Sequence, residues 1–524
     1  MRTGPVIACV SLLAGTLVAL SGTTAQAAAT TYEAEASPAV CTGTIDSDWA
    51  GFTGTGFCNG TNAAGAYAQF TVNAPAAGTA TLTVRFANGT TAARPAALTV
   101  NGSAVASSTY EATGAWTTWA TKTFTVPVNA GANTVRLNPT SAAGLPNIDR
   151  LDAETTGTTT PPSGSALYVA PNGTDGAAGT ISAPTTLSSA IARVTSGGTI
   201  YLRGGTYHHS QTITVPAGTN GTAAARTKLS AYPGEQPVLN FSAMTEDPAN
   251  RGLAVNGSYW HVSGLVVERA GDNGIFVGGS NNVIERTVTR FNRDSGLQLS
   301  RIASTTPQSQ WPSHNLVLSA ESHDNADSDG EDADGFAAKL TVGPGNVFRY
   351  AVAHHNIDDG WDLYTKTDTG PIGTVTIEDS LAYENGTLSD GTQNASGDRN
   401  GYKLGGEDIA VDHVVRRSIA YRNGKHGFTY NSNPGSMAVS NNLSIDNAQR
   451  NYSFDAGTSV FRNNTSCRSA TGTNDRTIGD ADGSNQFWSG TNGSRCAAYS
   501  GALGWSYATD GRLAVTLGGR AVVL

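Results

Sequence analysis

The feature that most constrains the fold is a motif that recurs through the second half of the chain. Its first element ends in asparagine, and its second element carries a glycine, usually followed by an aromatic residue. The asparagines are about 24 to 38 residues apart, a period that indicates one coil of a stacked solenoid per repeat. They are Asn292, Asn325, Asn356, Asn385, Asn423 and Asn447, and the second elements read DNGIF, DSGLQ, ADGFA, DDGWD, RNGYK and KHGFT.

The repeated units predict strands rather than helices. They alternate polar and apolar residues with a period of two and are rich in β-branched and aromatic side chains. The chain as a whole contains 62 glycines and only 14% charged residues, which favours turns and short strands. In a parallel β-helix, the asparagines of successive coils can form a ladder of hydrogen bonds at an internal turn. Ordinary exposed turn asparagines are the alternative, but six in register favour the ladder.

The chain divides into four parts. Residues 1–27 read as a secretory signal peptide, with an apolar run followed by the cleavage motif Ala25-Gln26-Ala27. Residues 28–155 contain about eight short alternating segments separated by Gly- and Asn-rich turns, which predict a β-sandwich. Residues 156–165 (TGTTTPPSGS) form a linker, and residues 166–524 contain the solenoid.

Composition excludes some functions and predicts an exported protein. Four cysteines remain after the signal peptide, and an even number in a secreted chain favours disulfides. The pairs Cys41–Cys58 and Cys467–Cys496 are the economical connectivity, because each stays within one half of the chain. The net charge of −9 argues against nucleic acid as a partner, and no segment after the signal is apolar enough to span a membrane. We therefore expect a secreted, extracellular monomer.

Stacking the glycines of the second element predicts a cluster of aspartates. It places Asp334 beside Asp359 on the next coil, with Asp358 and Asp362 on the same coil as Asp359. Adjacent coils are ~4.8 Å apart, and carboxylates this close raise one another's pKa unless a cation lies among them. Oxygen ligands without Cys or His favour calcium over zinc or copper; magnesium prefers fewer carboxylates and more water. Taken alone, the D-D-x-x-D motif would be an ordinary solvated acidic turn.

The same alignment places Lys403 one coil beyond Asp362. Lys403 could simply form a salt bridge with Asp362. Alternatively, a lysine beside a divalent cation has its pKa lowered and can act as a general base. In a polyuronate the C5 proton lies α to a carboxylate that calcium can neutralise, so such a base would start an elimination that breaks the chain at C4. Arg399 is a candidate for binding a substrate carboxylate, or is a surface charge.

These residues resemble a known family. The stretches Gly197-Gly-Thr-Ile-Tyr-Leu-Arg-Gly-Gly-Thr-Tyr, Glu331-Asp-Ala-Asp-Gly-Phe, Asp358-Asp-Gly-Trp-Asp and Asn400-Gly-Tyr-Lys-Leu-Gly-Gly are similar to those of the pectate lyases of polysaccharide lyase family 9. The resemblance implies a right-handed parallel β-helix that cleaves polygalacturonate by calcium-assisted β-elimination. It also implies that Asp334, Asp358, Asp359 and Asp362 bind Ca²⁺ and that Lys403 is the catalytic base. The expected partner is an acidic plant cell-wall polysaccharide.

The N-terminal module resembles a family 35 carbohydrate-binding module, which is also a β-sandwich. The likeness lies in Tyr32-Glu-Ala-Glu, Gly51-Phe-Thr-Gly-Thr-Gly-Phe, Gly114-Ala-Trp-Thr-Thr-Trp and Pro146-Asn-Ile-Asp. It implies a structural calcium site at Glu33, Glu35 and Asp149. Asn147 and Trp116 are candidates for binding sugar by hydrogen bond and by ring stacking, although each tryptophan could instead belong to the core.

Two other functions remain open at this point. One is a β-helical glycoside hydrolase on pectin, which would use an aspartate pair and water and would need neither the lysine nor calcium. The other is a non-catalytic wall-binding protein in which calcium only staples the coils together. The leading prediction is an all-β, calcium-dependent pectate lyase with a sugar-binding module. The sequence does not decide between pectate and methylated pectin.

Overall fold

The computed structural model consists of two compact units, residues Met1–Thr160 and Pro161–Leu524. It describes residues 30–63, 65–74, 78–129, 131–156, 166–393, 396–508 and 510–524. The expected signal peptide, and all of the expected linker except Thr156, lie outside the described residues. No helix in these described ranges is long and apolar enough to cross a bilayer.

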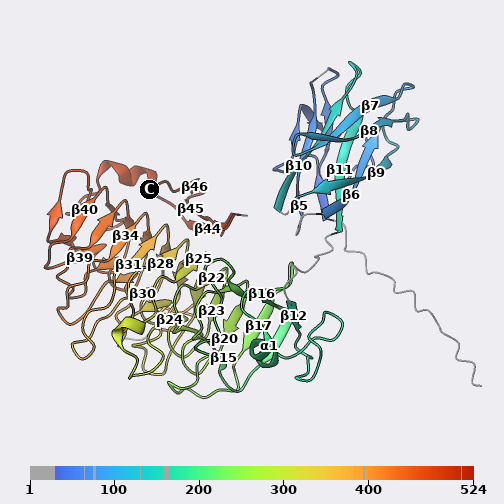
Figure 1. The fold of residues 1–524 in the computed structure, drawn as a ribbon. Coiled ribbons are helices and arrows are strands. Elements are labelled where there is room, and N and C mark those ends of the chain that lie inside the picture. The colour runs from blue at the N-terminus through green and yellow to red at the C-terminus, as the bar shows by residue number, and fades with distance from the viewer. Residues whose placement is uncertain are drawn as a thin grey trace, which may run out of the picture. The chain divides into compact units, whose positions relative to one another are not determined.

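The first unit is the expected β-sandwich of two antiparallel sheets (Figure 1). Alternate residues of its strands point inward, as in β5, where Phe70 and Val72 are buried and their neighbours Gln69 and Thr71 are half-buried. The disulfide Cys41–Cys58 forms as predicted and joins the two sheets. One sheet runs β3 (Gly43–Asp46), β4 (Phe57–Gly60), β11 (Asn147–Thr156), β6 (Gly78–Ala87) and β9 (Ala120–Val128), with β1 (Thr30–Glu33) beside β11; the other runs β2 (Val40–Cys41), β5 (Ala68–Ala74), β10 (Gly131–Pro139), β7 (Arg94–Val100) and β8 (Ser103–Tyr110).

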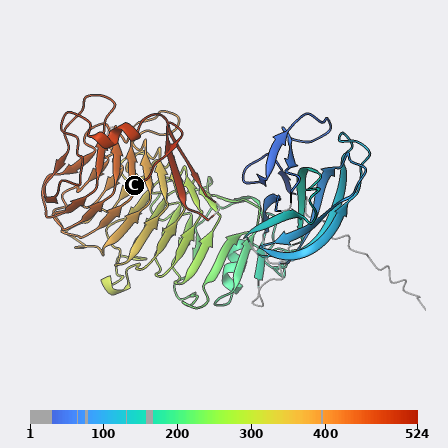
Figure 2. The same ribbon diagram turned by 90° about the horizontal axis from the view of Figure 1, so that it is seen from above.

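The second unit is the expected parallel β-helix, whose successive coils stack strand on strand into three parallel sheets (Figure 2). The first sheet contains β12 (Ala166–Val169), β13 (Thr199–Leu202), β16 (Thr227–Ala231), β19 (Trp260–Ser263), β22 (Val283–Glu285), β25 (Leu316–Leu318), β28 (Asn346–Arg349), β31 (Val375–Glu378), β34 (Val414–Arg416), β37 (Ala438–Ser440), β40 (Val460–Arg462) and β43 (Asp480–Ala481). The second contains β14 (Gly205–His208), β17 (Pro237–Asn240), β20 (Val266–Glu268), β23 (Val288–Arg290), β26 (Glu321–His323), β29 (Val352–His354), β32 (Leu381–Tyr383), β35 (Ile419–Tyr421), β38 (Leu443–Ile445) and β41 (Thr465–Cys467). The third contains β15 (Ile213–Val215), β18 (Leu253–Val255), β21 (Ile275–Val277), β24 (Leu297–Leu299), β27 (Phe336–Ala338), β30 (Trp361–Asp362), β33 (Tyr402–Lys403), β36 (Phe428–Thr429), β39 (Tyr452–Phe454) and β42 (Arg476–Thr477).

One apolar core runs through the middle of the coils. The third sheet contributes a column of aromatic rings to it, because the residue directly after each motif glycine points inward and is aromatic from Phe336 onward. The rings of Trp361, Tyr402, Phe428 and Tyr452 follow one another at centroid distances of 4.8, 4.6 and 5.1 Å. Helix α1 (Leu187–Arg193) packs Leu187, Ala190 and Ile191 onto the first coils at the N-terminal end. Two short 3₁₀ turns occur at Gln308–Gln310 and Ser494–Ala498.

The predicted asparagine ladder is present and buried. The Nδ2 of each asparagine donates to the Oδ1 of the asparagine on the next coil, over 2.8 to 2.9 Å from Asn292 through to Asn447. Each backbone N–H of Asn356, Asn385 and Asn423 also donates to the Oδ1 of the asparagine that follows. The ladder therefore satisfies amides that would be costly to bury alone, and it fixes the alignment of the coils.

The glycines of the second element stack directly over this ladder. A Cβ atom added to Gly335, Gly360 or Gly401 would lie 2.8 Å from the Nδ2 of the ladder asparagine on the following coil. It would also lie 2.6 to 2.7 Å from the carbonyl oxygen of the next stacked glycine. No side chain fits there, so the glycine register and the asparagine ladder depend on each other.

The C-terminal tail, for which the sequence predicted no function, covers the outer face of the second sheet. It forms the antiparallel strands β44 (Leu503–Tyr507), β45 (Leu513–Leu517) and β46 (Arg520–Ala521). Val515 and Leu517 pack against the outward side chains of Leu381, Ile419 and Leu443. Trp505 donates through Nε1 to the hydroxyl of Tyr383 (3.1 Å), and the predicted disulfide Cys467–Cys496 ties the start of the tail to the last coils.

Replacing one ladder residue tests this account. We expect Asn385→Ala to destabilise the solenoid by about 2–4 kcal/mol, because it removes the acceptor of the Asn356 N–H and Nδ2 groups and one donor to Asn423 inside the buried ladder. The thermal denaturation midpoint of the solenoid transition measures the effect. Asn474→Ala, at an exposed position, is the matched control and should leave the midpoint unchanged. Equal midpoints for the two variants would contradict a structural role for the ladder.

Candidate metal centre and active site

Three of the predicted aspartates meet where two coils turn into the third sheet. Asp334 precedes Gly335 at the start of β27, and Asp358 and Asp359 precede Gly360 at the start of β30. One oxygen of each of the three carboxylates lies within 4.8 Å of the others, and all three side chains are buried. The N–H of Gly335 donates to the carbonyl of Asp359 over 2.9 Å, so the predicted glycine register is confirmed at this site.

The three carboxylates are held in place by hydrogen bonds from neighbouring coils. Asp334 accepts from the hydroxyl of Ser295 (3.0 Å), and Asp359 accepts from the N–H of Asn400 (2.5 Å) through Oδ1. Asp358 accepts from the N–H groups of Asp398 and Arg399. The second oxygen of Asp359 is buried without a hydrogen bond, although Nζ of Lys403 lies 3.4 Å from it. A buried carboxylate oxygen rarely lacks a hydrogen bond, so this oxygen is able to bind a cation.

The electrostatics also fit a cation. Burial, followed by repulsion from neighbouring carboxylates, raises the pKa of Asp358 and of Asp359 well above its ordinary value. Burial is also the largest cause of the raised pKa of Asp334, about 7, although Lys339 partly opposes it. A hard divalent cation prefers oxygen ligands and would compensate this concentration of negative charge. The donor set therefore fits calcium, as the sequence predicted.

Asp362, the fourth predicted ligand, lies beside the triad and is held by two lysines. Its Oδ2 is 3.5 Å from Nζ of Lys339 and 3.6 Å from Nζ of Lys403, and its Oδ1 accepts from the N–H of Tyr364 (2.9 Å). The register predicted for Asp362 and Lys403 is confirmed, because they are direct partners between β30 and β33.

Lys339 is a site residue that sequence reasoning missed. Its ammonium is buried and lies 2.9 Å from Asp334, so it shares this ligand with the cation site. Burial opposes the charge, but Asp334 and Asp362 more than offset it and raise the pKa of Lys339 well above its ordinary value. Lys339 follows the end of β27, where the strand register no longer aligns residues. A lone lysine close after the acidic run Glu331–Asp334 was the only signal.

Lys403 lies among carboxylates as predicted. Its Nζ is 3.1 Å from Asp398, 3.4 Å from Asp359 and 3.6 Å from Asp362, and its side chain is 10% exposed. Burial lowers the pKa of Lys403, but Asp362, Asp359, Asp358 and Asp334 outweigh it, so the protein groups alone hold the pKa above its ordinary value. Asp398, on the coil of Lys403, is a second site residue that the sequence did not reveal.

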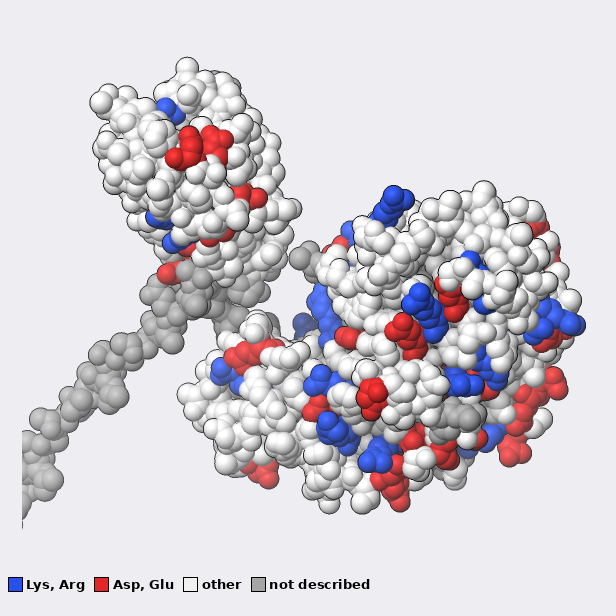
Figure 3. Space-filling view, turned by 180° about the vertical axis from the view of Figure 1, so that it is seen from behind, with Lys and Arg blue, Asp and Glu red and all other residues white. Residues whose placement is uncertain are grey.

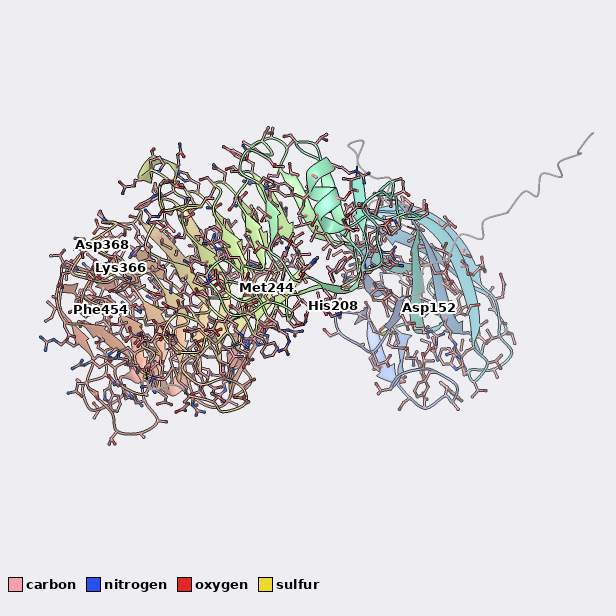
Figure 4. All side chains as sticks on the ribbon, turned by 90° about the horizontal axis from the view of Figure 1, so that it is seen from below. Asp152, His208, Met244, Lys366, Asp368 and Phe454 are labelled. Carbon is pink, nitrogen blue, oxygen red and sulfur yellow. A yellow bond between two sulfur atoms is a disulfide. The ribbon has the colours of Figure 1, made fainter. Side chains whose placement is uncertain are left out.

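These residues open into one pocket of about 430 Å³. Lys403, Lys339, Asp358 and Asp362 line it, and so does Lys366, which is labelled in Figure 4. The complete lining comprises Glu331, Asp332, Lys339, Leu340, Asp358, Asp362, Tyr364, Lys366, Ser396, Asp398 and Lys403. On the face of the solenoid shown in Figure 3, acidic and basic side chains interleave without a broad cationic surface.

Arg399, the predicted substrate-binding arginine, takes a different position. Its side chain packs against two glycines, Gly386 and Gly424. A Cβ atom added to Gly386 would lie 2.5 Å from the Arg399 Cβ, and one added to Gly424 would lie 3.0 Å from it. Arg399 is not among the described residues that line the pocket. A direct contact between Arg399 and substrate stays a prediction that this geometry does not favour.

The predicted calcium residues of the sandwich gather around the loop Thr53–Thr55. The Thr53 hydroxyl donates to Glu33 (2.9 Å) and the Thr53 N–H donates to Asp149 (2.9 Å), while the N–H of Thr55 donates to Glu35 (2.7 Å). Burial is the largest cause of the raised pKa of Glu33. Asp149 also forms an ion pair with the guanidinium of Arg85, which already balances one of the three charges. Calcium binding here stays a prediction.

The two predicted sugar-binding residues of the sandwich lie at different depths. Asn147 begins β11 and is buried, with 4% of its surface exposed. The Trp116 ring is half-buried against Gly89, and the guanidinium of Arg94 lies 5.7 Å from its centroid. Part of the Trp116 ring is therefore exposed to a ligand, whereas almost none of the Asn147 side chain is.

Comparison with known proteins agrees with this geometry. The family described as "Pel9A-like, right handed beta helix region" matches residues 167–485. "Pectate lyase L" of Paenibacillus polymyxa (strain SC2) is 55% identical over 324 residues, which is 62% of this chain and 72% of that protein. The solved structure described as "Crystal structure of pectate lyase Pel9A" is 35% identical with a TM-score of 0.54, over 62% of this chain and 80% of that chain. The expected right-handed β-helix is therefore confirmed.

The N-terminal unit matches a separate family. "Carbohydrate binding module (family 6)" matches residues 41–155, so the expected carbohydrate-binding module is confirmed. A solved "CBM35 from Cellvibrio japonicus Abf62" is 43% identical over 24% of this chain and 91% of that chain, with a TM-score of 0.23.

The raised carboxyl pKa values predict how metal binding depends on pH. A carboxyl with a raised pKa stays protonated until the pH exceeds that value, and a cation needs the deprotonated form. Calcium affinity should therefore rise about tenfold or more between pH 6 and pH 8.5, since the pKa of Asp334 is about 7 and those of Asp358 and Asp359 are raised. Isothermal titration calorimetry measures the affinity and the protons released.

Asp359→Asn is the variant for the same titration. It should weaken calcium binding at both pH values, because it removes the carboxylate whose second oxygen has no donor. An affinity that is the same at pH 6 and pH 8.5 would show that these three carboxylates do not bind the ion.

Proposed function

The chain belongs to the Pel9A-like family of right-handed β-helix proteins, and on that premise we propose that it is a calcium-dependent pectate lyase. It would cleave polygalacturonate by β-elimination and leave 4,5-unsaturated ends. The relatives named pectate lyase support the substrate class, and the site geometry supports the reaction type.

The observation that carries the proposal is the position of Lys403. It lies one coil beyond the aspartates, directly paired with Asp362 in the strand register, and its Nζ is within 3.4 Å of Asp359. An amine held beside a cation site is the arrangement that proton abstraction next to a carboxylate requires. A hydrolase would need two carboxyl groups placed around a water, whereas here the carboxylates adjoin two lysines.

The chemistry follows from the acidity of the C5 proton of a uronate. Asp334, Asp358 and Asp359, with Asp362 beside them, would hold calcium, which when bound would neutralise the substrate carboxylate and so acidify this proton. Lys403 would take the proton through Nζ as the C5–H bond breaks. The electron pair would form the C4–C5 double bond, and the glycosidic oxygen at C4 would leave.

The charge around Lys403 explains why this reaction should depend on the metal. Asp359, Asp362 and Asp398 keep the ammonium charged, and a charged lysine has no free electron pair with which to take a proton. Only when the charge of these carboxylates is balanced does burial of the side chain favour the neutral amine. Lys339, held by Asp334, would remain charged and would keep Asp334 and Asp362 in place.

The proposal extends to the location of the enzyme and to the role of its sandwich module. We infer that the protein is secreted as a monomer and acts on acidic plant cell-wall polysaccharide. The sandwich module would hold the enzyme near its polymer, with Trp116 and Asn147 as candidate contacts. Thr53, Glu33, Glu35 and Asp149 would stabilise the loop that borders that module's binding end.

Chelation tests the metal requirement. On polygalacturonate the protein should generate unsaturated products, measured by their ultraviolet absorbance, and EDTA should abolish the signal. Added calcium should restore it, because the carboxylates then no longer hold Lys403 in its charged form. Saturated reducing ends formed equally well with EDTA would indicate a hydrolase and would contradict the proposal.

Replacing the base tests the role of Lys403. Lys403→Ala should lower kcat by at least about 100-fold, the usual loss when a general base is removed. It should still bind calcium, measured by calorimetry, because the triad is retained. Lys228→Ala, an exposed lysine on β16, is the matched control and should keep full activity. A folded Lys403→Ala enzyme with normal kcat would exclude Lys403 as the base.

A further inference from the structure

We propose that Lys366 binds the carboxylate of a sugar residue next to the one that reacts, and that it selects for unesterified uronate at that position. The inference rests on the proposed function and names a specificity residue for it. Lys366 lines the same pocket as Lys403 and lies on the loop that follows Asp362, between β30 and β31.

The three lysines of the pocket are in different electrostatic situations. The ammonium groups of Lys339 and Lys403 are buried and each lies within 4 Å of three carboxylates. The Lys366 side chain is exposed and forms no ion pair within 4 Å with a described residue, although its charge also acts on Glu407. Lys366 is thus the lysine of this lining that is best placed to pair with an incoming anion.

The loop that presents Lys366 is firmly built. The Tyr364 hydroxyl donates to Glu407 over 3.2 Å, and the N–H of Thr367 donates to the same carboxylate over 2.6 Å. The carbonyl of Lys366 accepts from the N–H groups of Thr369 and Gly370, over 3.1 and 2.8 Å. Residues on both sides of Lys366 are therefore tied to Glu407 on the next coil, which restricts where the lysine can lie.

The Tyr364 ring lines the same pocket as Lys366 and lies beside the base. Gly406 packs so closely on this ring that an added Cβ would lie 2.2 Å from it, which fixes the ring against the next coil. The ring centroid lies 5.3 Å from Nζ of Lys403. A sugar residue that lies over Tyr364 would have the base beside it, and Lys366 lines the same pocket two residues further along the loop.

The charges of the lining give the substrate a preferred direction. Glu331 and Asp332 border the pocket just before Asp334 in the chain and would repel a polyanion, whereas Lys366 attracts it. A uronate carboxylate gains a charge-assisted hydrogen bond from Lys366, and a methyl ester does not. An unesterified residue at this position is therefore bound more tightly than its methyl ester.

Binding and kinetics of Lys366→Gln test the proposal. Trigalacturonate should bind the calcium-loaded Lys403→Ala protein about fivefold more tightly than the Lys403→Ala/Lys366→Gln protein, as measured by calorimetry. In the active enzyme, Lys366→Gln should raise KM for polygalacturonate about fivefold while kcat stays within twofold. Its KM should also depend less on sodium chloride, because one charge pair is missing.

Controls separate the possible outcomes. Lys366→Arg should restore most of the affinity, and Lys228→Gln, at an exposed position on β16, should change neither KM nor affinity. The fully methyl-esterified trisaccharide should bind equally with and without Lys366. Unchanged KM and affinity in Lys366→Gln, with unsaturated products still formed by the unchanged enzyme, would overturn this inference alone. Failure of the unchanged enzyme to form unsaturated products would overturn the proposed function as well.

Discussion

The interlock between the asparagine ladder and the stacked glycines determines the rest of the β-helix. Each ladder amide both donates to and accepts from a neighbouring coil, and each glycine lies too close to the next asparagine to carry a side chain. The two features hold successive coils in one register. The residues on either side of each glycine then acquire neighbours that are distant in sequence, and Asp334 meets Asp359 for this reason.

The same register creates an electrostatic problem at the site. Asp334, Asp358, Asp359 and Asp362 lie together with Lys339 and Lys403, so four carboxylates adjoin two ammonium groups. The raised carboxyl pKa values show that the negative charge is unfavourable at this buried position, and a divalent cation would balance the remaining charge. The cation, Lys339 and Lys403 would then share one set of oxygens, so metal binding and the protonation of the base are coupled.

The sequence revealed the parts of this arrangement that repeat. The ladder, the glycine register and the alignment of Asp362 with Lys403 all follow from a period that can be read along the chain. Lys339 and Asp398 could not be predicted in this way, because they lie in turns whose lengths differ from coil to coil. Arg399 shows that a regular position does not fix where a side chain lies: its side chain packs beside Gly386 and Gly424, and its contact with substrate stays a prediction.

The three faces of the solenoid carry different outward side chains, and these determine what each face contacts. The first sheet carries ion pairs, such as those of the buried Glu378 with the partly exposed Arg349 and Arg416. The second sheet carries an outward row of apolar side chains that water would not favour, and the C-terminal strands cover it. The third sheet is left with Asp362 and Lys403 in its outward row, facing the pocket. Because the tail closes the second face and not the third, it protects the apolar surface of the fold while leaving the site open to a long polymer.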